Sequence, residues 1–393
     1  MRVLTIIKTS TGGDWLAPLL AGLVQRGHEV RVLLPDPAGS LGLLLADRGI
    51  AVAGLPVPVA GARPFGLVKG FRELRRLVVD WQPHVVHYQL YLSALIGRAV
   101  TIGLRDTATV HMVPGPLFLE QPLIRMVERL LCRRDGAVIA ASEYTYDLYR
   151  RMGYPVERLH YIPYATDLRQ FRPASRDERL LARGTLGVPE GAFVAVCVAY
   201  FYPPRRSIFH GLGVKGHDVL LRGWAQYRRD GGDGFLLLVG DGWGERGRAY
   251  LREMKDLATA LGIAESVVWT GYLADPRLAY RAADVSVAPS RSENHGSAVE
   301  AAGMGVPTIA SRAGGLPEVV SDGDTGWLFV SGDASALADR LGAARSAVAD
   351  GSAREMGERA RNAIATIYDD TTSVVRFCEV VEQWGPGTEL EGS

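Results

Sequence analysis

Residues 288–318 have the sequence APSRSENHGSAVEAAGMGVPTIASRAGGLPE. An apolar strand is expected just before this stretch, at 285–287, and the pattern predicts a helix over 297–304 and a further strand over 307–310. The helix opens with three small residues, Gly-Ser-Ala, at 296–298. Small residues leave the first backbone N–H groups of a helix accessible, and such groups bind anions. The stretch therefore predicts a strand, loop and helix with an anion site at the helix start.

Two carboxylates, Glu293 and Glu300, flank this helix start. A carboxylate repels a phosphate, so these side chains are better suited to accept hydrogen bonds from hydroxyl groups on either side of the anion. A nucleotide sugar offers that pattern, with ribose hydroxyls, then a diphosphate, then sugar hydroxyls. The alternative is a charged loop followed by a helix whose first turn is stabilised by acidic residues.

Outward from this stretch, strand-length apolar runs alternate with amphipathic helical segments along the whole chain. Further strands are expected at 2–7, 30–34, 85–88, 107–111, 137–141, 192–199, 234–239 and 267–269. Further helices are expected at 15–25, 66–80, 120–133, 143–152, 217–229, 248–261, 276–283 and 371–384, with Asp14 as the N-cap of the first. Such alternation predicts an α/β fold with parallel sheets covered by helices on both faces.

The length of 393 residues predicts two domains. A polar, turn-rich segment at 172–191 suggests the boundary, which gives a domain at 1–190 and another at 191–365. Both are expected to be doubly wound and Rossmann-like, facing each other across a cleft, with ligands beyond the carboxyl ends of the strands. The segment 366–393 is expected to contain a helix followed by a frayed tail from 385.

Composition excludes several classes of protein. Lys plus Arg number 44 and Asp plus Glu 43, and this near-neutral balance argues against a general nucleic-acid binder. Hydrophobic residues make up 47%, too many for a disordered chain. The three cysteines, Cys132, Cys197 and Cys378, are odd in number and far apart, which indicates a reducing compartment and no disulfide framework. Without a signal sequence or an apolar run long enough to cross a bilayer, a soluble cytoplasmic protein is expected.

The 288–318 stretch resembles the C-terminal donor motif of the retaining family 4 glycosyltransferases, which have the GT-B fold. The resemblance extends over roughly residues 1–365 and is stronger in the second half. It also implies that the helix within 366–393 crosses back to the first domain. The other matching motifs are Gly-Gly at 12–13, RGHEVRVL (26–33), LLLVGDG (236–242), VVWTGYL (267–273), ADVSVAPS (283–290), AGGLPEVV (313–320) and DGDTGWLF (322–329).

The resemblance implies a role for each matching residue in the second domain. Glu300 is expected to bind the ribose hydroxyls of the donor, and Glu293 the transferred sugar. Lys215, in VKGHDVLL, is expected to stabilise the departing diphosphate. The distal phosphate is expected on the backbone N–H groups of Gly296, Ser297 and Ala298.

Further donor contacts are expected from the backbone, at Gly13 for the diphosphate and around Gly271 and Tyr272 for the nucleobase. The candidates for acceptor binding are Asp14, His111 and Glu120. The expected catalytic residues are Glu293, Lys215 and His111.

This chain departs from the family pattern at two places in the donor region. Six residues separate Glu293 from Glu300, whereas the family usually has seven, and the shorter loop could shift or rotate Glu293. The family also places a Gly-Arg pair shortly before the lysine, and this pair is missing here. The longer loop AYFYPPRRSIFHGLGVKG (199–216) offers Arg205 or Arg206 as the replacement cation, and His210 as a third candidate.

Two other motifs favour competing functions. Residues 242–247 form a G-x-G-x-x-G pattern after a strand, but no acidic residue follows at the distance that a dinucleotide site needs. Asp322 and Asp324 resemble a metal-binding D-x-D, but their small neighbours favour a tight turn, so no metal site is expected.

These observations predict a retaining, metal-independent glycosyltransferase with no cofactor beyond its nucleotide-sugar co-substrate. The expected donor is a UDP-hexose or UDP-N-acetylhexosamine, and the expected acceptor is a hydroxyl of a small molecule, such as an aminocyclitol of antibiotic biosynthesis. One alternative is a membrane-surface enzyme with a lipid acceptor, which would use the basic helix that carries Arg72, Arg75 and Arg76. An alternative of another class is an inactive nucleotide-sugar-binding protein.

Overall fold

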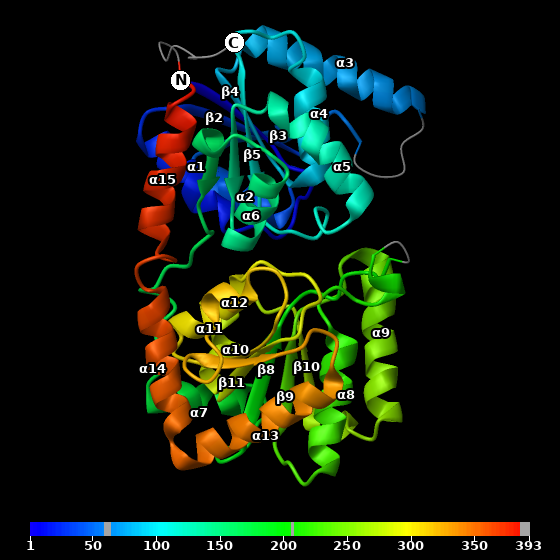
Figure 1. The fold of residues 1–393 in the computed structure, drawn as a ribbon, viewed down its shortest axis with the longest axis vertical. Coiled ribbons are helices and arrows are strands. Elements are labelled where there is room, and N and C mark those ends of the chain that lie inside the picture. The colour runs from blue at the N-terminus through cyan, green and yellow to red at the C-terminus, as the bar shows by residue number, and fades with distance from the viewer. Residues whose placement is uncertain (59–63, 206–207, 386–393) are drawn as a thin grey trace. The chain divides into compact units, whose positions relative to one another are not determined.

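The computed structural model describes residues 1–58, 64–205 and 208–385 (Figure 1). The chain divides into two compact units. The first unit contains Met1–Ala165 together with the C-terminal segment from Asp370, and the second contains Thr166–Asp369. The tail expected to be frayed lies outside the described residues from 386 onward.

The first unit is built on a sheet of seven parallel strands, in the order β3-β2-β1-β4-β5-β6-β7. The strands are β1 (Arg2–Ile6), β2 (Glu29–Leu34), β3 (Ala51–Gly54), β4 (Val85–Gln89), β5 (Ala108–Val113), β6 (Ala137–Ala140) and β7 (Leu159–Tyr161). Strand β1 pairs with both β2 and β4, so the strand order reverses there. In such sheets the reversal point opens a crevice at the carboxyl ends of the strands.

Helices cover both faces of this sheet. They are α1 (Leu16–Gln25), α2 (Ser40–Asp47), α3 (Pro64–Trp81), α4 (Leu90–Val100), α5 (Pro122–Leu131), α6 (Glu143–Arg151) and α15 (Asp370–Glu382). Alternate residues of β1 face opposite sides of the sheet, as strand geometry requires. Val3 packs into the core that includes α1 and α15, whereas Leu4 and Ile6 pack into the core that includes α3 and α4.

The second unit has a sheet of six parallel strands, in the order β10-β9-β8-β11-β12-β13. The strands are β8 (Val194–Val198), β9 (Phe235–Val239), β10 (Val267–Gly271), β11 (Val285–Ala288), β12 (Thr308–Ser311) and β13 (Gly326–Phe329). The helices are α7 (Arg176–Thr185), α8 (His217–Arg229), α9 (Gly244–Ala260), α10 (Arg277–Ala282), α11 (Gly296–Gly303), α12 (Leu316–Val319), α13 (Ala334–Asp350) and α14 (Ser352–Ile364). The order reverses between β8 and β11.

The predicted α/β class with two doubly wound, Rossmann-like sheets is confirmed. The units divide between Ala165 and Thr166 rather than at the expected 190/191, because the turn-rich segment contains α7 and is bonded to the second unit. Arg179 and Arg183 of α7 both pair with Asp284, at 2.5 and 2.9 Å. These buried pairs fix the segment 166–190 to the second sheet.

Two further expectations have outcomes in the fold. The expectation that Asp14 caps the first helix is wrong, because α1 begins at Leu16 with Trp15 at the N-cap position and no side-chain cap. The three cysteines are buried free thiols. Within the described ranges, the helices include none with the length and apolar character needed to cross a membrane.

Candidate active site

Lys215 and Glu293 form an ion pair where the strand order of the second sheet reverses. Lys215 lies in the connection that follows β8, and Glu293 lies in the loop between β11 and α11. The Lys215 ammonium donates to Oε2 of Glu293, and the Ser290 hydroxyl donates to the same oxygen at 2.9 Å. The Asn294 N–H donates to the other carboxylate oxygen at 3.1 Å. The structure thus brings together two of the three expected catalytic side chains.

Both members of this pair are held in their charged forms. Burial alone would lower the pKa of Lys215, but the Glu293 carboxylate outweighs burial and the pKa is raised. Burial alone would raise the pKa of Glu293, but Lys215 and the bond from Ser290 lower it. A cation and a carboxylate are therefore both present here at neutral pH.

Two glycines let the surrounding backbone approach this pair. Gly216 has a φ of 68°, and a methyl group there would overlap the carbonyl oxygen of Pro289. Gly314 has a φ of 53°, and a methyl group there would overlap the carbonyl oxygen of Glu293, which accepts the N–H of Gly315 at 3.1 Å. The loop that carries Glu293 is therefore held by backbone contacts that only glycine permits.

The start of α11 follows this loop, with His295 at the N-cap position. Ala298, expected to bind phosphate through its N–H, instead donates that N–H to the carbonyl of His295 at 2.9 Å. The helix begins with this tight turn, and the phosphate contact expected of the Ala298 N–H stays a prediction. The N–H groups of Gly296 and Ser297 donate to no other group within the described part of the chain, and they remain as the anion site.

Glu300 lies on the first turns of α11 beside Tyr280 of α10. The Tyr280 hydroxyl lies 3.0 Å from Oε2 of Glu300 and 3.1 Å from the carbonyl oxygen of Ser297. Its single proton can serve one acceptor at a time, and its position fixes the orientation of both. The sequence analysis did not identify Tyr280, because it lies twenty residues before Glu300 in an apolar segment.

The carboxyl end of β10 carries Gly271 and Tyr272. Gly271 has a φ of 70°, and its carbonyl accepts the N–H of Gly240 at 2.9 Å. Tyr272 is exposed, and its ring stacks on Tyr200 with the centroids 6.2 Å apart and the planes 16° apart. Trp243 meets Tyr200 edge-on at 5.0 Å. These aromatic residues follow β8, β9 and β10, a recurrence after three strands that sequence analysis could have recognised.

The candidates for the missing arginine are not joined to the pair. Arg205 is exposed in a turn where its carbonyl accepts the N–H groups of Ile208 and Gly211 at 2.9 and 3.1 Å. Arg206 lies outside the described residues. His210 is exposed, with a φ of 53°. No hydrogen bond or ion pair within the described ranges connects Arg205 or His210 to Lys215 or Glu293.

The two competing motifs have structural roles. Asp322 accepts the N–H of Leu328 at 2.8 Å and pairs with Arg312 at 2.9 Å, while Asp324 pairs with Arg359 at 2.8 Å. The D-x-D is thus a turn whose carboxylates already have cationic partners. In the G-x-G-x-x-G segment, a methyl group at Gly247 would overlap the carbonyl oxygen of Phe201, so glycine permits close packing of α9 against the segment that follows β8.

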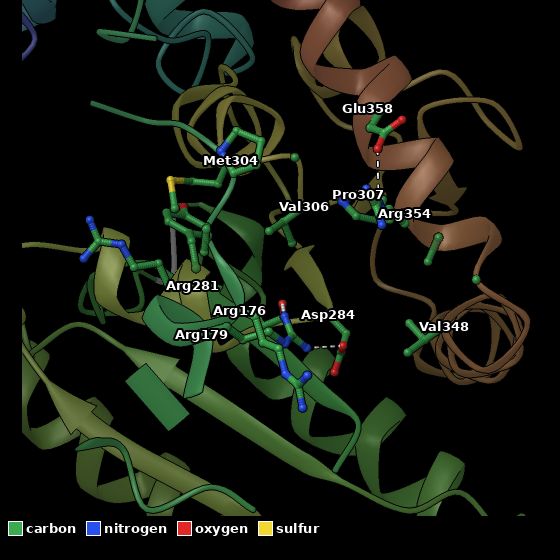
Figure 2. A pocket seen from close by; sticks show the side chains of 17 residues that line it. Arg176, Arg179, Arg281, Asp284, Met304, Val306, Pro307, Val348, Arg354 and Glu358 are labelled. Carbon is green, nitrogen blue, oxygen red and sulfur yellow. Dashed lines mark hydrogen bonds and ion pairs between the residues drawn. The ribbon is translucent and has the colours of Figure 1, made fainter. Parts of the chain in front are cut away.

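A separate cavity of about 560 Å³ lies at the opposite edge of the second sheet (Figure 2). Its wall includes Asp284 and Pro307, which precede β11 and β12, and none of the expected site residues. Two ion pairs lie in its wall, Arg179 with Asp284 at 2.5 Å and Arg354 with Glu358 at 3.2 Å (Figure 2). The cavity lies between α7 and α14. The candidate active site is therefore placed at the carboxyl ends of the strands instead.

In the first unit, Gly13 and Asp14 follow β1 at the reversal point of that sheet. Gly13 has a φ of 81°, and its carbonyl accepts the N–H of Leu16 at 2.9 Å. Burial raises the pKa of Asp14, with Arg48 opposing. Glu120 follows β5, and after burial it is the largest cause of the raised pKa of Tyr144, to which it is hydrogen-bonded.

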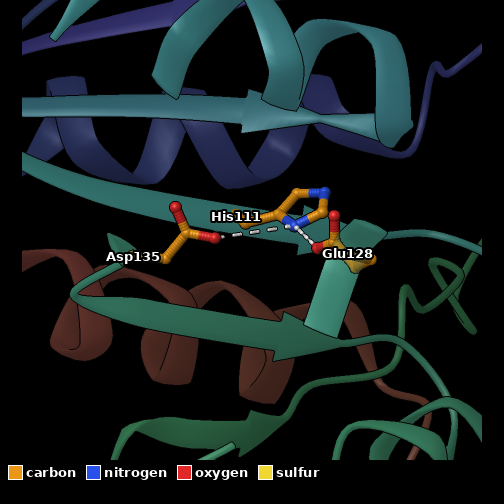
Figure 3. A group of neighbouring side chains, drawn as sticks. All are labelled: His111, Glu128 and Asp135. Carbon is orange, nitrogen blue, oxygen red and sulfur yellow. Dashed lines mark ion pairs between the residues drawn. The ribbon is translucent and has the colours of Figure 1, made fainter. Parts of the chain in front are cut away.

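His111 lies on β5 and is almost fully buried. Its ring, Glu128 and Asp135 have ligand atoms within 4.8 Å of one another, a spacing that would suit a metal ion (Figure 3). The Arg98 guanidinium, however, bonds to both carboxylates, so the cation of this cluster is an arginine. Sequence analysis missed these three partners because they are scattered between residues 98 and 135.

Comparisons with known families match both units. A family model described as "Glycosyl transferases group 1" matches residues 206–345, and one described as "Glycosyl transferase 4-like domain" matches residues 14–165. The first match contains Lys215, Glu293 and Glu300, and the second contains His111.

Curated relatives cover most of the chain. A D-inositol 3-phosphate glycosyltransferase from Nocardia farcinica is 32% identical over 350 residues, which span 82% of this chain and 74% of the relative. A GDP-mannose-dependent alpha-(1-6)-phosphatidylinositol monomannoside mannosyltransferase from Mycolicibacterium smegmatis is 32% identical over 329 residues, which span 80% of this chain and 73% of the relative.

Solved structures share the fold over nearly the whole chain. HepE from Anabaena in complex with UDP-glucose superposes with a TM-score of 0.80 at 21% identity, covering 98% of this chain and 100% of that one. Sucrose-phosphate synthase from Thermosynechococcus elongatus superposes with a TM-score of 0.79 at 22% identity, covering 98% and 99%. The chain therefore belongs to the group 1, family 4-like glycosyltransferases and has their GT-B fold.

Proposed function

We propose that this chain is a retaining glycosyltransferase that moves a sugar from a UDP-hexose or UDP-N-acetylhexosamine to a hydroxyl of a cyclitol, a small hydroxylated cyclohexane. The observation that carries the proposal is the Lys215–Glu293 pair beside the start of α11. It offers a cation for a diphosphate and a carboxylate for sugar hydroxyls, side by side at the crevice where doubly wound sheets bind ligands.

In the proposed reaction the bond between the sugar and the distal phosphate breaks, and a bond to the acceptor oxygen forms on the same face. The acceptor proton passes to the departing phosphate oxygen. Lys215 and the N–H groups of Gly296 and Ser297 stabilise the charge that develops on the nucleoside diphosphate. Glu293 orients the sugar hydroxyls, and Glu300, held by Tyr280, binds the ribose.

The proposal includes no metal and no cofactor, because Lys215 and backbone N–H groups supply the positive charge that the diphosphate needs. Transfer measured after exhaustive EDTA treatment is expected to equal the untreated rate. A loss that Mg²⁺ or Mn²⁺ restores would contradict this part of the proposal.

The cyclitol class of acceptor is supported from two sides. The curated relatives are named for D-inositol 3-phosphate and a phosphatidylinositol mannoside, both of which contain an inositol ring. The donor motif and composition resemble those of enzymes that glycosylate aminocyclitols. The two acceptors share a hydroxylated six-membered carbocycle and differ in charge, an anionic phosphate against cationic amines.

The donor is tested first by thermal unfolding with UDP, GDP, dTDP, ADP and NAD at saturating concentration. A ligand at 100 times its dissociation constant adds about 2.7 kcal/mol, which moves the melting temperature by several degrees. A shift with UDP is expected, whereas a shift with GDP alone would replace the donor base. Transfer from the matching nucleotide sugar is then assayed with inositol phosphates and with aminocyclitols, and turnover of neither would overturn the acceptor class.

A lipid acceptor at a membrane surface is a second candidate, favoured by the outward face of α5. Leu123, Met126 and Leu130 are 69%, 57% and 69% exposed at helical spacing, while Glu128 of the same helix is buried. A helix with its apolar stripe outward offers a surface for a partner. The same helix and the turn after it carry Arg125, Arg129 and Arg133, which suit anionic headgroups.

Co-sedimentation with anionic vesicles tests this candidate. Replacement of Leu123, Met126 and Leu130 by Glu should abolish binding if the surface docks on lipid. Replacement of Leu181, which is 73% exposed in the second unit, is the matched control. Wild-type protein that ignores anionic vesicles would remove the lipid candidate. An inactive binding protein, the candidate of another class, is removed by any sugar transfer or donor hydrolysis.

A further inference from the structure

Three charged side chains are buried next to His111 in the first unit. Arg98 comes from α4, Glu128 from α5 and Asp135 from the turn before β6, and all are at most 5% exposed. Arg98 donates from Nη1 and Nη2 to the two oxygens of Glu128, both at 2.7 Å. It donates from Nε and Nη2 to Asp135, at 3.1 and 2.5 Å.

One guanidinium here faces two carboxylates, which leaves an excess negative charge inside the protein. Burial would raise the pKa of Glu128, but its bonds to Arg98 and His111 hold the pKa well below the usual range, so Glu128 is ionised. An uncompensated buried charge is costly. A hydrogen bond donated by a neighbouring imidazole N–H is what can stabilise the second carboxylate.

That nitrogen is Nδ1 of His111. It lies 3.3 Å from Oε1 of Glu128 and 3.9 Å from Oδ2 of Asp135, the two ion pairs that Figure 3 marks with dashed lines. Nη2 of Arg98 lies 3.2 Å from Nδ1, but its two protons have shorter bonds to the carboxylates. The Tyr149 hydroxyl also donates to Glu128, at 2.7 Å. Nδ1 therefore faces acceptors and is placed to donate.

The ring of His111 lines a small cavity. Its Nε2 is buried and has no hydrogen-bond partner within the described part of the chain. The cavity beside the ring measures about 20 Å³ and is lined mainly by apolar and aromatic side chains, among them Leu90, Tyr91 and Phe118. A cavity of this size holds one water molecule or one hydroxyl group. With the proton on Nδ1, the lone pair of Nε2 is available to accept a hydrogen bond there.

We infer that Glu128, backed by Arg98 and Asp135, is a positioning residue that keeps the His111 proton on Nδ1, so that Nε2 accepts a hydrogen bond from the acceptor hydroxyl. The inference rests on the proposed function, in which His111 lies on the acceptor side. It adds three residues outside the family motifs to the acceptor site, and it gives His111 a defined tautomer.

The tautomer is tested in the full-length wild-type protein by two-bond ¹H–¹⁵N NMR of the histidine rings. The expected spectrum shows a protonated Nδ1 and a bare Nε2 for the neutral ring of His111. A neutral His111 with its proton on Nε2 would overturn the inference. This measurement needs no substrate, so it stands even if no sugar transfer is found and the proposed function fails.

The role of Glu128 is tested by Glu128→Gln, which keeps the shape but removes the negative charge that faces Nδ1. The proton should then move to Nε2, and kcat for transfer should fall by about 10²-fold or more while the KM for the donor stays unchanged. The matched control is Asp284→Asn, which removes a carboxylate that two arginines bind in the second unit.

Both variants are expected to lose stability, but Asp284→Asn should keep its kcat per folded molecule. A kcat for Glu128→Gln within threefold of this control would overturn the positioning role. If Glu128→Gln does not fold, the tautomer of the wild-type protein decides the inference.

Discussion

Lys215 and Glu293 neutralise each other inside the second unit, so removing the lysine has two effects. The carboxylate is left partly buried without its cation, and the departing diphosphate loses its point charge. We expect Lys215→Ala to lower kcat by about 10²- to 10³-fold, as the loss of a charge-stabilising donor does elsewhere. The control is Lys255→Ala on α9, which also removes a lysine ammonium from the second unit, one that lies over the ring of Trp269. Equal rates for the two variants in a transfer assay would contradict the role of Lys215.

His217 is a buried residue whose titration belongs to stability rather than catalysis. Its ring stacks on Phe201 at 3.9 Å, and burial, aided by Lys215, lowers its pKa to about 3. His217 therefore takes up a proton near pH 6.5 in the unfolded chain but stays neutral in the folded chain. The free energy of unfolding consequently decreases as the pH falls from 6.5 toward 3.

Each such histidine contributes a slope of about 1.4 kcal/mol per pH unit in this window. Urea unfolding of His217→Gln between pH 6.5 and 4.5 should show a slope smaller by about that amount than the wild-type slope. Parallel slopes would show that His217 is protonated in the folded protein.

At the residue scale, the sequence could predict side chains that lie close together along the chain. Glu293, Glu300 and the start of α11 come from one short stretch, and Lys215 was found through its motif. Tyr280, which orients Glu300, has no local signal because its partner is one helix away. The bond from the Ala298 N–H to the carbonyl of His295 could not be predicted, because the tight first turn of α11 depends on the conformation of His295.

At the scale of a single element, the conformation of the loop between β11 and α11 depends on Gly314. An alanine there would carry both left-handed strain, about 1–2 kcal/mol, and an overlap with the carbonyl of Glu293. Gly332 has a φ of 87° but open space around it, so Gly332→Ala carries the strain alone. We expect Gly314→Ala to raise the donor KM and lower kcat well beyond Gly332→Ala in steady-state kinetics. Matching kinetics would mean that the loop tolerates displacement.

Helices and strands with a strong hydrophobic periodicity could be predicted from the sequence. Those whose amino-acid composition hid this signal could not. The helix expected at 217–229 is observed as α8 with the same bounds. The segment 172–191 was interpreted as the domain boundary because it is polar and rich in turn-forming residues, yet it contains α7. Ser175 and Glu178 form a capping box there, a local signal that the polar composition obscured. Strand β3 has four residues, mostly exposed, and its short apolar run is followed at once by the glycine and prolines of IAVAGLPVP (50–58), which favour a turn over a strand.

At the scale of the whole molecule, the first unit is completed by the last helix of the chain. Phe377 of α15 is fully buried in the core that also contains Val3 and residues of α1. We expect Phe377→Ala to destabilise the first unit by about 3–5 kcal/mol, as cavities of this kind do. Hydrogen exchange should accelerate in β1 and β4 and remain unchanged in β8 and β11. Val375→Ala, on the exposed side of the same helix, is the control.

The return of the chain to the first unit could be expected from the sequence, but the residues against which α15 packs could not. A methyl group at Gly22 of α1 would overlap Val374, so the two helices meet at a glycine. The apolar face of α15 was visible in the sequence. Its packing against α1, more than 340 residues earlier, is a property of the tertiary structure alone.

This topology has a consequence for synthesis on the ribosome. The second unit is one continuous segment, Thr166–Asp369, and every strand of it has emerged before α15 is made. The first unit begins earlier but lacks Phe377 and its neighbours until α15 has left the exit tunnel. The nascent chain thus completes its second unit first. Until α15 has emerged, the part of the seven-stranded sheet's core that this helix covers stays exposed. Chaperones that bind exposed apolar surface would meet this protein through its N-terminal half.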